Sequence, residues 1–134
     1  MKITEALAVE HRLLRAMMDA LGQWLSEGMA EDRLRQRAAM LELAIDDHTA
    51  REEQLLFDPL CAAHPEAREQ VDLMVVVHDE VRGLFAEVSD PARTVKDRLW
   101  TILMLTGEHF TKEETAIFPL AEELMGASLP QVSL

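Results

Sequence analysis

The sequence predicts an all-α protein, folded as an antiparallel up-down four-helix bundle. Good helix formers fill its long stretches, and the five glycines and five prolines cluster at a few places between them. Within each stretch the apolar residues recur at alternating steps of four and three, which is typical of helices that pack at shallow angles. No strand-like alternation of apolar and polar residues competes with this pattern.

The composition fits one soluble domain. A chain of 134 residues is long enough for a single core, and its net charge of −12 argues against nucleic acid or an anionic membrane as a partner. The single cysteine, Cys61, excludes an internal disulfide and favours a reducing compartment. Glu5 and Glu10 interrupt any secretion signal, and no segment has the ~20 apolar residues needed to span a bilayer. We therefore expect a cytoplasmic protein.

The first two predicted helices form one hairpin. The first covers about residues 4–26 and ends before Gly28, a residue type that commonly follows a helix. The second begins near Ala30, continues past Glu53 and is broken around His64 and Pro65. The apolar stripe of the first is Ile3, Leu7, His11, Leu14, Met18, Leu21 and Leu25; that of the second is Leu34, Ala38, Leu41, Ile45, His48, Glu52 and Leu55.

The last two predicted helices form a second hairpin. The third covers about residues 66–88, and the fourth begins near Thr94, which with Asp97 has the spacing of a capping box, and continues to Pro119 or a turn beyond. Their stripes are Val71, Met74, His78, Val81, Phe85 and Val88, then Val95, Leu99, Ile102, Thr106, His109, Glu113 and Ala116. We expect the domain to span residues 1–126, with residues 127–134 as a short C-terminal tail.

Polar residues interrupt all four stripes. Each stripe carries one histidine, two carry a glutamate four residues after it, and none carries a Lys or Arg that could pair with those carboxylates. Burying an ionised carboxylate without a cation is costly, and a core built only for stability would hold leucine at these positions. The candidate site residues are therefore His11, His48, Glu52, His78, His109 and Glu113.

The two hairpins resemble a weak duplication. The segments that begin at His48 and His109 read HTAREEQLLFDPL and HFTKEETAIFPL. Those that begin at His11 and His78 read HRLLRAMMDAL and HDEVRGLFAEV. Distances along ideal helices place His11 and His48 at similar heights, about 26–30 Å from the turn at Gly28. His109 fits less well, because it lies about one helical turn further from its connection than His78 does.

This pattern predicts a pair of metal ions. Residues four apart share a helix face, so each His–Glu pair can bind one ion or two adjacent ions. Imidazole and carboxylate ligands suit Fe, Mn or Zn, and four histidines with two glutamates fit two divalent ions. With both carboxylates and an oxo or hydroxo group bridging the ions, about one open position per metal would remain for a small molecule.

The chain resembles the hemerythrin-like (HHE cation-binding) domain family. The resemblance covers residues 3–120 and rests on two His-x-x-x-Glu motifs, each followed by Phe and Pro, with a lone histidine on each alternate helix. It implies a non-haem di-iron centre that binds, senses or transports oxygen, or that handles iron or nitric oxide. The four histidines would be terminal ligands, and Glu52 and Glu113 would be the bridging carboxylates.

The sequence departs from the oxygen carriers of that family at Met74. The carriers have a further histidine at this position, so here the two metals should be nearly equivalent and both more open. Such a site favours redox turnover or tight product binding over reversible transport. Glu53 and Glu114 point about 100° away from the preceding glutamates in a regular helix, so we expect them either to support a ligand from outside or to face solvent.

Three functions fit these residues. The preferred one is a di-iron protein that binds or senses oxygen, nitric oxide or iron. The second is a di-iron enzyme that consumes peroxide or nitric oxide, and the third is a helical interaction module with a zinc site or a vestigial one. Ferritin-like bundles use Glu-x-x-His pairs instead, and the absence of tyrosine excludes a tyrosyl-radical enzyme.

Overall fold

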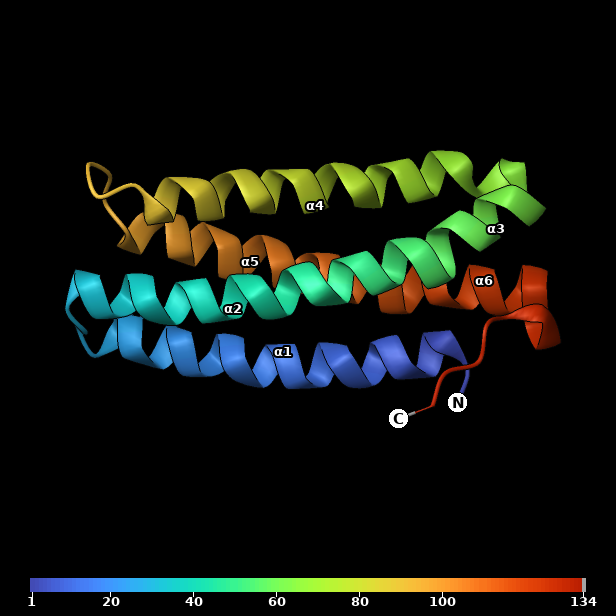
Figure 1. The fold of residues 1–134 in the computed structure, drawn as a ribbon, viewed down its shortest axis with the longest axis horizontal. Coiled ribbons are helices and arrows are strands. Elements are labelled where there is room, and N and C mark those ends of the chain that lie inside the picture. Colours follow the sequence, from blue (N-terminus) through green and yellow to red (C-terminus); the bar gives the residue numbers. More distant parts are fainter. Residues whose placement is uncertain (134) are drawn as a thin grey trace.

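The computed structural model describes residues 1–133, and Leu134, the last residue of the predicted tail, lies outside the described residues. The prediction of an antiparallel four-helix bundle is confirmed (Figure 1). The four long helices are α1 (Ile3–Ser26), α2 (Glu31–Glu52), α4 (Arg68–Ser89) and α5 (Lys96–Lys112). None of the helices in residues 1–133 has a long enough apolar stretch to cross a membrane.

Both helices that carry a His-x-x-x-Glu motif continue through a π turn into a short helix. After α2 come η1 (Glu53–Phe57) and α3 (Asp58–Ala63), and after α5 come η3 (Glu113–Ile117) and α6 (Phe118–Met125). Pro59 and Pro119 lie in the first turns of α3 and α6, where a missing N–H is tolerated. The sequence did not predict the π turns, because a π turn adds one residue without changing the residue types.

The helix boundaries agree with the predicted ones except at the capping box. The 3₁₀ turn η2 (Pro65–Ala67) precedes α4. Gly28, which follows α1, has a φ of +78°, in the left-handed region that favours glycine. The predicted capping box is wrong, because α5 begins after Val95 and no side chain of the described residues caps it. The Thr94 hydroxyl instead accepts a hydrogen bond from Arg98 Nη1 at 3.1 Å.

The core consists of two apolar clusters with a polar layer between them. On α1, Leu7 belongs to one cluster and Leu14 to the other, and His11 lies between them; on α4, Met74 and Val81 flank His78 in the same way. The predicted site therefore lies in the interior of the bundle, sealed at both ends by apolar side chains.

The described part of the predicted tail packs against the start of the chain. After the 3₁₀ turn η4 (Gly126–Ser128), Lys2 and Gln131 form an isolated antiparallel bridge, and Ile3 N–H donates to the Pro130 carbonyl at 2.9 Å. Leu129 is only 2% exposed and belongs to the cluster that contains α3 and α6. The start of the chain and residues 129–132 therefore lie at the same end of the bundle (Figure 1).

Candidate metal centre

The polar layer contains all six residues that the sequence singled out. His11 comes from α1, His48 and Glu52 from α2, His78 from α4, His109 from α5, and Glu113 from the first position of η3. All six are buried, and both glutamates are fully inaccessible to solvent. The extra turn before His109 is taken up by the connection of residues 90–95, so that His109 Nε2 lies 2.8 Å from His78 Nε2.

The six side chains form two groups that share both carboxylates. One group contains His11 and His48, the other contains His78 and His109, and Glu52 and Glu113 belong to both; within each group one ligand atom per residue lies within 4.8 Å of the others. Each lone histidine is approached by the glutamate of the other hairpin: His11 Nε2 lies 3.2 Å from Glu113, and His78 Nε2 lies 3.2 Å from Glu52. The two hairpins therefore build one site together.

Apart from the Nε2 atoms of His78 and His109, which contact each other, the inward-facing atoms lack hydrogen-bond partners within residues 1–133. The Nε2 atoms of His11 and His48 and all four carboxylate oxygens of Glu52 and Glu113 are buried without a hydrogen bond within residues 1–133. Buried polar groups are almost always paired, so these imidazole nitrogens and carboxylates form a set of donors that bound cations would satisfy. The donor set of four imidazoles and two carboxylates fits two such ions.

The pKa values of these groups reflect their burial. Desolvation raises the pKa of Glu113 to about 7, and desolvation together with the nearby charge of Glu113 raises the pKa of Glu52 well above its ordinary value. Burial and the neighbouring cationic groups lower the pKa of His11 to about 2 and that of His109 to about 4. Both imidazoles are therefore neutral at pH 7, the form that binds metals.

Three more carboxylates hold the outer nitrogens of the histidines. Glu114 Oε1 lies 3.2 Å from His11 Nδ1, Glu53 Oε1 lies 3.3 Å from His78 Nδ1, and Glu10 Oε1 lies 2.8 Å from His48 Nδ1. Of the two alternatives for Glu53 and Glu114, the structure therefore shows the supporting contact. Such contacts fix the orientation and tautomer of a metal-binding imidazole.

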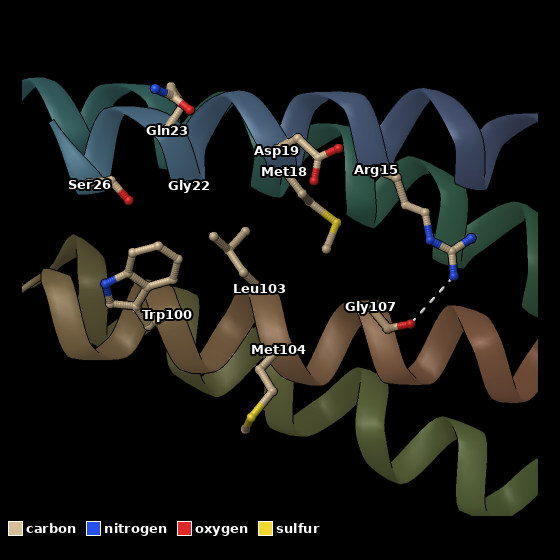
Figure 2. A pocket seen from close by; sticks show the side chains of 10 residues that line it. All are labelled: Arg15, Met18, Asp19, Gly22, Gln23, Ser26, Trp100, Leu103, Met104 and Gly107. Carbon is tan, nitrogen blue, oxygen red and sulfur yellow. Dashed lines mark hydrogen bonds between the residues drawn. The ribbon is translucent and has the colours of Figure 1, made fainter.

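Two arginines pair with these outer carboxylates. Arg51 Nε donates to Glu10 at 3.0 Å, and Arg15 Nη1 donates to Glu114 at 2.8 Å. Arg15 also lies at one end of an open groove of about 530 Å³ between α1 and α5, where its guanidinium reaches the Gly107 carbonyl at 3.5 Å (Figure 2). The Arg15–Glu114 pair thus stands between this groove and His11.

Sequence reasoning missed Glu10, Arg15 and Arg51. All three lie beside the apolar stripes, where they look like ordinary surface residues, and their partners lie on other helices. One available signal was position: Glu10 adjoins His11, and Arg15 follows it by one helical turn.

An all-α bundle with two buried groups of histidine and glutamate defines a protein with a candidate dinuclear metal site. The family model of the hemerythrin HHE cation binding domain matches residues 2–121, most of the chain. The chain belongs to this family. No match was found among curated proteins or among solved structures.

Proposed function

We propose that this protein binds two iron ions, bridged by Glu52, Glu113 and an oxo or hydroxo group, and that this centre binds or senses a small molecule such as oxygen or nitric oxide. The sharing of both carboxylates between two pairs of imidazoles carries the proposal. His11 and His48 would hold one ion, and His78 and His109 the other. Mn or Zn could occupy the same donor set, so the metal itself is tested below.

The surroundings of the site favour a small, neutral ligand. Bound iron would supply an open coordination position and one-electron redox chemistry. Phe110 stacks on His11 with ring centroids 4.0 Å apart, and Phe57 stacks on His78 at 6.0 Å, so apolar rings exclude water from the ligands. The cavity beside His78 and His109 measures only about 20 Å³, room for little more than a water or a diatomic molecule.

A redox enzyme that consumes peroxide or nitric oxide is the second candidate. The buried hydroxyl of Thr106 lines that same cavity and has no hydrogen-bond partner among the described residues. It offers a proton-bearing group close to His109, which a reduction reaction requires. The binding proposal and the enzyme proposal predict different behaviour after oxygen is added.

The first test is metal stoichiometry. Protein loaded anaerobically with ferrous iron and freed of excess metal should retain about two irons per chain, and His78→Ala should retain fewer. His64→Ala is the matched control, since His64 lies outside the site, beside Glu66 at 3.2 Å. Fewer than about one metal per wild-type chain, with a stability indifferent to a chelator, would contradict the proposal and leave an interaction module.

The second test is the visible spectrum before and after air. A stable, reversible absorption band supports binding or sensing. Rapid loss of the band, with repeated turnover of added peroxide or nitric oxide, supports the enzyme. Zinc in place of iron in the protein as purified from cells would contradict both.

A further inference from the structure

The duplication of the hairpins is broken at one residue beside the site. His11 and His78 occupy equivalent positions, as do His48 and His109, and Glu114 and Glu53. Glu10, which precedes His11, holds His48 Nδ1 at 2.8 Å, but the equivalent residue before His78 is Val77. Within residues 1–133, three of the four imidazoles therefore have a carboxylate on Nδ1, and His109 does not.

A small cavity lies where the fourth carboxylate would be. Val77, Thr106 and His109 line the cavity of about 20 Å³ between α2, α4 and α5. His109 Nδ1 and Thr106 Oγ1 are both buried, and within residues 1–133 neither has a hydrogen-bond partner. The cavity has room for one water molecule, and the two polar atoms would bind it.

The tautomers of the imidazoles follow from these contacts. A carboxylate on Nδ1 keeps the proton there and leaves Nε2 free as a metal ligand, which holds for His11, His48 and His78. His78 Nε2 therefore accepts in its 2.8 Å contact with His109 Nε2, and His109 must donate. In the metal-free protein the proton of His109 is on the nitrogen that a metal would need.

Resting on the proposed dinuclear function, we propose that the position served by His78 and His109 binds its cation more weakly than the one served by His11 and His48. The two positions would then be unequal, in contrast to the near-equivalence that Met74 led us to expect from the sequence. Binding there requires His109 to lose its Nε2 proton and gain one on Nδ1, so the ring keeps one proton throughout. A cavity water takes the place of the carboxylate on Nδ1. Loss of such an outer partner typically weakens metal binding on the order of 10- to 100-fold.

The direct test is partial loading with zinc. Crystals of metal-free protein given one equivalent of Zn²⁺ should show anomalous scattering mainly at the His11–His48 position. When one equivalent is shared by two sites the occupancy ratio is the square root of the affinity ratio, so we expect a ratio of about 3 to 10. Val77→Glu supplies the missing carboxylate and should bring the two occupancies close together. Val76→Glu, which adds the same charge at an exposed neighbouring position, should leave the ratio unchanged.

Two further measurements keep the proposal testable if Val77→Glu does not fold. Glu10→Val removes the carboxylate from His48 and should also bring the occupancies together, by weakening the tighter position. Nitrogen NMR of the metal-free wild type should show three Nδ1-protonated histidines at the site and one Nε2-protonated, His109. Equal occupancies in the wild type, or four Nδ1-protonated rings, would overturn the proposal. Zinc at neither position would overturn the proposed function instead.

Discussion

Burying the carboxyl group of Glu113, which suits it to bind a cation, makes the metal-free fold less stable when that carboxyl is ionised. Its carboxyl group is fully buried, and desolvation raises its pKa to about 7, whereas in the unfolded chain it titrates near 4.5. The folded state therefore binds a proton more tightly than the unfolded state does. The resulting stability is fully present below pH 4.5 and is lost as the pH rises through 7.

Glu113→Gln should therefore stabilise the metal-free protein at pH 8. We expect the free energy of unfolding to rise by roughly 3 kcal/mol at pH 8, and the gain to vanish near pH 4. Urea unfolding at both pH values, with chelator present, measures it. Glu108→Gln on the exposed face of α5 is the control and should change little. An equal or lower stability of Glu113→Gln at pH 8 would show that the carboxyl is not desolvated.

Local spacing made the six candidate residues predictable, because i and i+4 share a helix face in any regular helix. The outer contacts were not predictable in this way. The partner of Glu10 is on α2 and that of Arg15 is on η3, so each pair depends on how helices pack against one another. The cavity at Thr106 depends on packing in the same way.

At the scale of elements, each π turn accommodates one extra residue, so that the helix beyond the site still turns its apolar residues toward the core. Because η3 contains an extra residue, Glu113 faces the metal-binding groups while Ile117 and Phe118 beyond it still face the core. The sequence shows the repeat of the motif but not the extra residue, since residue types do not distinguish an α turn from a π turn. This is why the helix was predicted as one regular segment.

Deletion of Thr115 should turn η3 into an ordinary α turn. Because the π turn is what accommodates the extra residue, its removal should leave Ile117 and Phe118 in the core. We expect the free energy of unfolding to change by about 1 kcal/mol or less, measured by thermal and urea unfolding. Thr115→Ala, which keeps the residue count at the same exposed position, should have almost unchanged stability. A loss of roughly 3 kcal/mol or more in the deletion variant would mean that Ile117 and Phe118 leave the core, and would contradict this account of the π turn.

Alanine substitutions at two glycines should change the stability in opposite directions. At Gly83, inside α4, an added Cβ meets no atom within 4 Å, so Gly83→Ala should stabilise the protein by about 0.5–1 kcal/mol. Gly28 has equal space but a φ of +78°, so Gly28→Ala should destabilise it by about 1–2 kcal/mol. Urea unfolding of both variants checks the signs, and the same sign for both would refute this explanation.

At the scale of the whole molecule, two apolar clusters enclose a polar layer. The sequence predicted this arrangement in outline, because each stripe is apolar on both sides of its histidine. It did not predict that the segment after Gly126 completes one of the clusters, since the residues from 127 on show no helical periodicity.

Leu129→Ala should reveal this contribution. The side chain is 2% exposed, and we expect its truncation to lower the free energy of unfolding by about 2–5 kcal/mol. Leu43→Ala, at a side chain that is 70% exposed, is the control and should cost far less. Similar losses for both variants in urea unfolding would mean that the segment is not part of the core in solution.

Because Lys2 and Gln131 are bridged, the two hairpins could be joined in either order along the chain. A few added residues from Val132 back to Met1, whose carbonyl accepts the Val132 N–H at 2.8 Å, would close the chain into a ring. New ends cut within residues 90–95 would then place the second hairpin first in the sequence. Such a circular permutant keeps every contact described for the site. It therefore tests whether the order in which the two hairpins are synthesised affects their final arrangement.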